Sequence, residues 1–415
     1  MGWLVAIAAT LGMSVSYVDR QTLAAIGPSV REGLGIDHAQ FGWFVSAFSM
    51  AYLVGAPIAG IVVDRLGARR GFAIAVVVWS IIAGLHAVAS SFAMLFLLRI
   101  LLGTAEAPSF PAAAQSIRRA LPGASKTIGY GLVFTGSSLG AIIAAKLAIG
   151  LDAAFGFRFA FLGTALIGTG WIPFWLIVTR NTDLARSDPE KKGEPMNPRA
   201  WVGLVTSAPV LRAIVAVIGS APILMFVLNF TSQYLVETWK LPKSGIATEL
   251  VVPPLLFDIG AIGFGFLASR REHRPRATHR DLMLVAMLLA SVLALAPLAK
   301  SSNVAVMIFG AAAAGGGGVY VLVTADMLGR VPLGQTSSAG GMTAAAQSLS
   351  LIIASPLVGW SIDRTHSYTT ALVVLGVAVI PAVLAFVAWP VGDGTKPPDD
   401  VESAHADAPH DAQGR

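Results

Sequence analysis

Twelve long apolar segments, separated by shorter polar stretches, run through this 415-residue chain. A helix that crosses a membrane needs about 20 predominantly apolar residues, and each of these segments is close to that length. Hydrophobic residues make up 55% of the chain and charged residues only 13%, whereas a soluble domain holds about 25% charged residues. The sequence therefore predicts an all-α membrane protein with twelve transmembrane helices. We expect these helices at residues 3–26, 41–63, 71–89, 92–113, 128–151, 159–178, 210–235, 250–268, 282–299, 304–323, 340–362 and 371–389.

The most polar internal stretch, residues 180–199, lies between the sixth and seventh apolar segments. It indicates two six-helix halves, residues 1–179 and 210–390, joined by a cytoplasmic linker over residues 180–209. The polar, proline-containing tail at residues 391–415 is predicted to be disordered and cytoplasmic. Most Lys and Arg residues of the loops fall on one side of the predicted membrane, which is the pattern of the cytoplasmic side. Both termini are therefore expected in the cytoplasm.

The composition also excludes several classes of chemistry. The chain has no cysteine, so disulfides, Cys-based metal sites and thiol redox chemistry are ruled out. The net charge of +6 comes mostly from loop residues, so we expect a lipid bilayer and no nucleic acid as the surroundings. Neither an H-E-x-x-H zinc motif nor a P-loop occurs in the sequence. We accordingly expect neither an enzyme nor a metal or cofactor.

Four charged residues lie inside predicted helices: Asp19 and Arg20 in the first, Arg99 and Glu106 in the fourth. Charges at membrane depth are costly, and they usually face a water-filled cavity or a substrate path. Arg99 and Glu106 are seven residues apart, so they share one helix face about 10 Å apart along the axis. The arginine fork suits a carboxylate ligand, and a buried carboxyl group suits proton exchange. This set predicts a cavity that takes up an organic anion together with protons.

A short pattern recurs at two helix ends. The second predicted helix ends in G-x-x-x-D-R-x-G-x-R-R over residues 60–70, and the eleventh ends in G-x-x-x-D-R over residues 359–364. Both are middle helices of a three-helix unit, which indicates an internal repeat. The longer pattern resembles the loop signature of the major facilitator superfamily. The resemblance implies the two-half, twelve-helix major facilitator fold and a gating role for Asp64, Arg65, Arg69 and Arg70.

Other segments resemble the anion:cation symporters of that superfamily, which carry hexuronates, aldonates and aldarates and are similar to vesicular glutamate and sialic-acid carriers. They include Y-V-D-R at residues 17–20 and R-I-L-L-G-T-A-E-A-P-S-F-P at residues 99–111. In that family, the residues that match Asp19 and Glu106 are the proton carriers, and those that match Arg20 and Arg99 contact the anion. The resemblance implies a proton-coupled symporter that imports a sugar acid by alternating access. It also implies a monomer. The Ala-rich and Gly-rich composition indicates a bacterial source and therefore a cytoplasmic (inner) membrane.

Several polar side chains on other helix positions are candidates for contacts with the substrate. Tyr17 shares a helix face with Arg20, and a polar cluster that includes Ser232 and Tyr234 ends the seventh predicted helix. Residues 135–138 read T-G-S-S, where members of the family often carry Asn or Gln, so the preferred polyol length and stereochemistry stay open. The expected substrate-binding residues besides the two arginines are Tyr17, Tyr52, Ser137, Ser138, Asn229, Gln233 and Gln347.

The same residues allow plainer interpretations, which the sequence leaves open. Arg99 and Glu106 could form a purely structural ion pair, and Asp19 and Arg20 could lock a helix in place. Tyr52 could simply pack. For the function, the alternative is a carrier of small mono- or dicarboxylates by uniport, symport or exchange. A polytopic membrane sensor or enzyme is a further alternative that the motifs favour less.

Overall fold

The computed structural model describes residues 1–415 except 123–124, 183, 185–197, 271–278, 332–335 and 390–415. The side chains of a few helical residues, Asp64 among them, also lie outside the description. In the described part of the chain, all regular structure is helical, and twelve helical spans are long and apolar enough to cross a membrane. The predicted all-α architecture of twelve transmembrane helices is confirmed. The predicted disordered tail and residues 183 and 185–197 of the predicted linker fall outside the described residues.

The first half contains six membrane-spanning helical units and one short helix after the first of them. Two of its helices begin at side-chain caps. Asp37 accepts a 2.7 Å hydrogen bond from the Gln40 amide at the start of α3, and Ser91 accepts one from the Met94 amide at the start of α5. Such caps satisfy amides that have no partner within the helix. The elements are α1 (Gly2–Ala25), α2 (Gly27–Leu34), α3 (His38–Leu66), α4 (Ala68–Leu85), η1 (His86–Val88), α5 (Phe92–Glu106), α6 (Ser109–Ala120), α7 (Ser125–Phe155) and α8 (Phe157–Thr179).

The second half repeats this pattern after the short helix α10 (Pro198–Val205). A short helix again follows its first membrane span, and the helices α13, α14 and α17 gather around α11 and α15. The elements are α11 (Ala208–Asn229), α12 (Thr231–Thr238), η2 (Lys243–Gly245), η3 (Glu249–Val251), α13 (Val252–Ser269), α14 (Arg280–Ser291), η4 (Val292–Leu298), α15 (Ser302–Leu328), α16 (Thr336–Thr365) and α17 (Thr369–Ala388).

The fourth predicted helix is broken in two. The sequence predicts a helix over residues 92–113, but α5 ends at Glu106 and α6 begins at Ser109, with Pro108 at its N-cap. Proline cannot donate the backbone hydrogen bond of a helix interior and disfavours helical geometry in the residue before it. The break therefore sets Glu106 at the carboxyl end of α5, inside the membrane span Phe92–Ala120.

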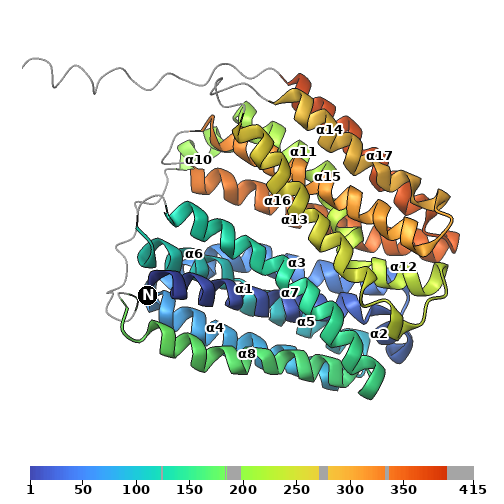
Figure 1. The fold of residues 1–415 in the computed structure, drawn as a ribbon, viewed down its shortest axis with the longest axis horizontal. Coiled ribbons are helices and arrows are strands. Elements are labelled where there is room, and N and C mark those ends of the chain that lie inside the picture. Colours follow the sequence, from blue (N-terminus) through green and yellow to red (C-terminus); the bar gives the residue numbers. More distant parts are fainter. Residues whose placement is uncertain (123–124, 183, 185–197, 271–278, 332–335, 390–415) are drawn as a thin grey trace, which may run out of the picture.

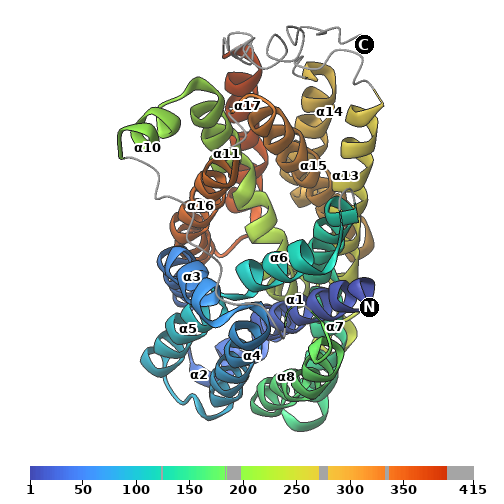
Figure 2. The ribbon, with the colours of Figure 1, turned by 90° about the vertical axis from the view of Figure 1, so that its left-hand side faces the viewer.

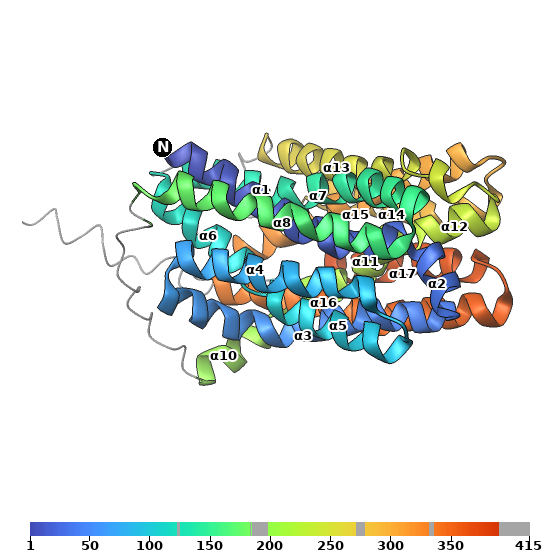
Figure 3. The same cartoon turned by 90° about the horizontal axis from the view of Figure 1, so that it is seen from below.

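The two halves lie side by side along the length of the molecule (Figure 1). Figure 2 looks at the end where the chain begins, which we call the amino-terminal end. Figure 3 shows α2 and α12 together at the opposite end, which we call the distal end. Between the halves, α3 packs along α16, α1 meets α11, and α7 meets α13. Residues from both halves therefore face each other along these helix pairs.

Candidate functional site

An ion pair inside the bundle joins α1 to α5. The Nη2 atom of Arg20 lies 3.0 Å from Oε2 of Glu106, and its Nε atom lies 3.4 Å from the same oxygen. The Ser16 hydroxyl, one turn before Arg20, donates a 2.7 Å hydrogen bond to that oxygen. The Glu106 side chain is fully buried, while 19% of the Arg20 side chain remains exposed. The two charges are thus paired within the membrane span, and the arginine keeps access to space beside it.

Three aromatic rings surround the Arg20 guanidinium. Its Cζ atom lies 4.5 Å from the ring centre of Tyr17, 4.4 Å from that of Phe48 and 5.1 Å from that of Tyr52. Phe48 and Tyr52 also stack on each other, with ring centres 5.9 Å apart. Cation–π contacts hold a guanidinium in place without using its hydrogen-bond donors. The rings of both predicted tyrosines therefore lie against the Arg20 guanidinium.

Arg99 contacts the same Phe48 ring as Arg20. Its Cζ atom is 4.8 Å from the Phe48 ring centre, and its Nε atom donates to the Phe44 carbonyl oxygen at 3.4 Å. The residue is buried, and its Nη1 atom has no hydrogen-bond partner among the described residues. In this structure Glu106 pairs with Arg20 instead of Arg99, so the purely structural Arg99–Glu106 pair is not formed. Arg99 therefore holds a buried positive charge with an unused donor.

Asp19 is buried without a hydrogen bond. Only 3% of the residue is exposed, and both carboxyl oxygens are buried with no partner among the described residues. It does not pair with Arg20, because adjacent residues on a helix point in different directions. Glu106 is the charged neighbour that acts on it. Buried polar atoms without partners call for an explanation, and a proton or a ligand would supply one here.

The remaining predicted contacts are spread over three regions. Ser138 of α7 donates a 2.7 Å hydrogen bond to Asp258 of α13, which joins the two halves. Asn229 donates to the Met225 carbonyl oxygen of its own helix at 2.9 Å. Gln233 is fully buried and accepts from Arg31 at 3.3 Å near the distal end, so it does not join the group around Arg20. Ser137 on α7 and Gln347 on α16 are half-buried.

The predicted gating residues lie around the α3–α4 turn. Arg69 donates to the Thr179 hydroxyl at 3.0 Å and to the Leu176 carbonyl oxygen at 3.2 Å, so it ties α4 to α8 within the first half. Arg65 and Arg70 are exposed. The prediction for Asp64 falls on a side chain outside the described ones. A gating role for these residues stays a prediction.

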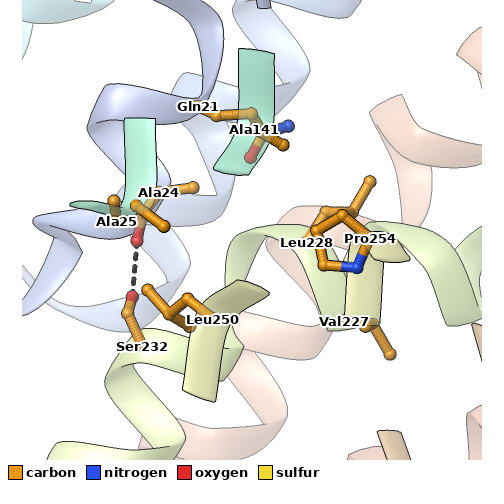
Figure 4. Close-up of a pocket in the computed structure, with 10 residues that line it drawn as sticks. Gln21, Ala24, Ala25, Ala141, Val227, Leu228, Ser232, Leu250 and Pro254 are labelled. Atoms are coloured by element: carbon orange, nitrogen blue, oxygen red, sulfur yellow. Dashed lines mark hydrogen bonds between the residues drawn. The ribbon is translucent and has the colours of Figure 1, made fainter. Parts of the chain in front are cut away.

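A narrow pocket lies between the halves, with Gln21 and Ala24 of α1 on one side and Leu228 and Pro254 on the other (Figure 4). Its empty volume is about 340 Å³, open solvent included. The Ser232 hydroxyl donates a 2.5 Å hydrogen bond to the Ala24 carbonyl oxygen beside it. Small apolar side chains make up much of the lining, so no charge or motif in the sequence pointed to it. Gln21, the residue after Arg20, lines the pocket, and the other lining residues of α1 lie further toward the distal end.

Residues 136–140 read G-S-S-L-G, which fits the letters of the G-x-S-x-G nucleophile elbow. That elbow requires a sharp turn between a strand and a helix. Here the segment lies inside the continuous helix α7, and Ser138 hydrogen-bonds a carboxylate across the interface. The pattern therefore carries no indication of a hydrolase.

Sequence reasoning missed a group of charged and polar residues at the distal end. The group bridges the halves through several ion pairs. Burial raises the pKa of Glu237, but hydrogen bonds from His38 and Tyr368 and the charges of His38 and Arg31 outweigh burial and lower it to about 2. In the sequence, only the repeated D-R pattern pointed to this group. The members lie on different helices, so their spacing along the chain does not bring them together. The members are Arg31 of α2, His38 of α3, Glu237 of α12, Asp363 of α16 and Tyr368, which precedes α17.

Comparison with known proteins agrees with this architecture. The model of the Major Facilitator Superfamily matches residues 9–355. The hexuronate transporter of Escherichia coli (strain K12) is 34% identical over 175 residues, which cover 42% of this chain and 40% of that protein. The hexuronate transporter of Bacillus subtilis (strain 168) is 25% identical over 387 residues, covering 90% of this chain and 91% of that protein.

Among solved structures, a bacterial homologue of the human lysosomal transporter Spinster superimposes with a TM-score of 0.70 at 17% identity. The match covers 93% of this chain and 94% of that chain, and it supports the fold alone. With the family match over most of its length, the chain belongs to the Major Facilitator Superfamily. The predicted superfamily and its resemblance to carriers of sugar acids are confirmed.

Proposed function

We propose that this chain is a proton-coupled symporter that imports an organic anion, a sugar acid such as a hexuronate, aldonate or aldarate, by alternating access. The observation that carries the proposal is the Arg20–Glu106 pair inside the membrane span. Nearby, both carboxyl oxygens of Asp19 and the Nη1 atom of Arg99 are buried with no hydrogen-bond partner among the described residues. The names of the relatives, hexuronate transporters, supply the class of substrate.

The geometry supports a direct competition between Glu106 and the substrate. Glu106 occupies two nitrogens of the Arg20 guanidinium, which are the same donors that a substrate carboxylate would use in a two-bond contact. A proton on Glu106 removes its charge and releases these donors. Since coupling between two ligands is reciprocal, the proton favours the anion and the anion favours the proton.

The neighbouring residues fit subsidiary roles in this cycle. Arg99 offers a second positive charge with a free donor, which suits an aldarate with two carboxylates. Tyr17 and Tyr52 flank Arg20, and their hydroxyls suit the hydroxyls of a sugar acid. Asp19 is a second proton carrier in the proposal, because its buried carboxyl group has no other partner.

The orientation follows from the loop charges, which favour a cytoplasmic location for both termini and for the linker. The distal end then faces the periplasm of a bacterial inner membrane. We propose that the protein works as a monomer, because each chain carries both halves and the complete Arg20–Glu106 group.

A carrier of small mono- or dicarboxylates, working by uniport, symport or exchange, is the second candidate. The same two arginines would bind such anions, and the narrow pocket beside Ser232 favours a small ligand. A polytopic sensor would bind the ligand but show no flux in liposomes. Thermal stabilisation of the purified protein separates sugar acids from small carboxylates as ligands, and flux in liposomes separates a carrier from a sensor. The compounds to compare are glucuronate, galacturonate, gluconate, galactonate, glucarate, lactate and oxalate.

The decisive experiment is uptake into proteoliposomes with an imposed pH gradient. We expect Glu106→Gln and Asp19→Asn to abolish accumulation against a concentration gradient, while exchange of labelled for unlabelled substrate continues. Asp281→Asn, which changes an exposed carboxyl group at the start of α14, is the matched control and should accumulate substrate as the wild type does. Accumulation that survives in both Glu106→Gln and Asp19→Asn would contradict the proposal.

A further inference from the structure

Asp363, near the end of α16 in the second half, caps a helix of the first half. Its Oδ1 atom accepts a 3.1 Å hydrogen bond from the His38 amide, and its Oδ2 atom accepts a 2.8 Å bond from the Ala39 amide. The His38 ring nitrogen Nδ1 lies 2.6 Å from Oδ1. These amides belong to the first turn of α3, where no carbonyl of the same helix can accept them. A carboxylate is also favoured there by the helix dipole.

The same helix start has a second cap, from its own half. Asp37 accepts from the Gln40 amide at 2.7 Å, and the Asp37 amide donates to Oε1 of the Gln40 side chain at 3.1 Å. The first three amides of α3 are therefore shared between two carboxylates, one from each half of the protein. Of these two caps, the Asp37 cap would stay in place if the halves parted at the distal end, and the Asp363 cap would break.

The backbones of α3 and α16 approach closely around this cap. A Cβ atom on Gly359 would lie 2.2 Å from the His38 carbonyl oxygen, and one on Gly42 would lie 2.4 Å from the Ser355 carbonyl oxygen. Further along, the Ser46 hydroxyl donates to the Ile352 carbonyl oxygen at 2.8 Å. Glycine at both crossings is what allows the carboxylate of one helix to reach the amides of the other.

Glu237 makes a second bridge between the halves beside the first. It forms an ion pair with Arg31, its Oε2 atom lies 2.8 Å from His38 Nε2, and it accepts a 2.8 Å hydrogen bond from the Tyr368 hydroxyl. At the exposed edge, Lys243 pairs with Glu32 across the same interface. The halves are therefore held together at the distal end by charge-assisted bonds, which are roughly twice as strong as neutral ones.

We propose that Asp363 and Glu237 are gating residues, which form a distal lock that holds the outer side closed and must break before that side can open to substrate. The proposal rests on the alternating-access cycle proposed above. Asp363 contributes more than Glu237 to the stability of the closed state, because it replaces water at two backbone amides and one ring nitrogen. The lock acts on the equilibrium between the closed and open distal ends and has no contact with Arg20 or Glu106.

The test is a distance measurement between spin labels across the distal end. The natural chain has no cysteine, so Ser90→Cys in the first half and Lys300→Cys in the second, both exposed, would carry the only labels. The purified full-length protein without substrate should show one short distance. In Asp363→Asn the ratio of long to short distances should rise at least about tenfold, the effect of losing one charge-assisted hydrogen bond. Glu237→Gln should shift the ratio in the same direction.

Asp37→Asn is the matched control, because it weakens a cap on the same turn of α3 without touching the second half. It should leave the distance distribution as in the wild type. An equal shift in Asp37→Asn and Asp363→Asn would overturn the proposal, since fraying of α3 would then be the cause. The proposal would also be overturned if neither Asp363→Asn nor Glu237→Gln changed the ratio of long to short distances. A failed uptake assay with a clear shift in distances would instead count against the proposed substrate or proton coupling alone.

Discussion

Replacement of Glu106 by glutamine tests whether that carboxylate and the substrate compete for one guanidinium. Arg20 gives two nitrogens to Glu106 Oε2, at 3.0 and 3.4 Å. A hydrogen bond to a charged group contributes about 1.5–3 kcal/mol, and every 1.4 kcal/mol is about tenfold in affinity. We therefore expect Glu106→Gln to bind glucuronate about 10- to 100-fold more tightly than the wild type at pH 8.

The assay is isothermal titration of the purified protein at pH 5.5 and pH 8. Wild-type affinity should fall as the pH rises, because the ionised Glu106 carboxylate reclaims Arg20. Glu106→Gln lacks this competitor, so its affinity should depend less on pH over this range. Ser16→Ala is the matched control, since it removes the hydroxyl that bonds to the same oxygen at 2.7 Å but leaves the competing charge. It should keep the pH dependence. The reasoning is refuted if Glu106→Gln keeps the wild-type affinity at pH 8 while Arg20→Gln abolishes binding.

Two further predictions concern the distal end. Gly359→Ala places a Cβ atom 2.2 Å from the His38 carbonyl oxygen and should destabilise the protein by about 1–3 kcal/mol, seen as a lower thermal midpoint; Gly341→Ala, on the same helix with open space around it, should not. The pKa of Glu237 is lowered to about 2. The stability that Glu237 gives to the closed state is therefore fully present above the ordinary carboxyl pKa of about 4.3 and is lost only as the pH falls toward 2. Between pH 5 and 8 the contribution of Glu237 should therefore be constant, so the distal label distance should show no pH dependence that arises from Glu237. A transition in that range that disappears in Glu237→Gln would contradict this prediction.

The helices could be predicted from the sequence because each one is marked by a long apolar segment of its own. Every predicted apolar segment coincides with a described membrane span, since a bilayer leaves few other choices for a long apolar stretch. The break after Glu106 was harder to predict, although Pro108 and Pro111 follow it in the sequence. Proline is tolerated inside membrane helices when neighbours satisfy the freed carbonyl groups, so its presence alone does not locate a break.

Partners across helices could not be predicted. The sequence places Arg20, Arg99, Asp19 and Glu106 inside the membrane but does not tell which arginine pairs with Glu106, because that depends on how α1 and α5 are rotated. The bond to Arg20 follows from Ser16 and Arg20 sharing one face of α1. Similarly, the D-R pattern at residues 363–364 resembles that at residues 64–65, yet only packing brings Asp363 to the start of α3.

Helix α1 physically connects the proposed binding site to the closure of the halves. Ser16 and Arg20 contact Glu106 on one part of the helix, and the Ala24 carbonyl oxygen, one turn further on, accepts from Ser232 of the second half at 2.5 Å. Four residues of helix rise about 6 Å, and a helix of this kind moves as a rigid unit over so short a length. In the proposed cycle, a shift of α1 on replacement of Glu106 by substrate at Arg20 would therefore also displace the Ala24–Ser232 contact. In the proposed cycle, substrate binding and closure of the halves would be linked through α1, and the proposed distal lock would set the free energy that a shift of α1 must overcome.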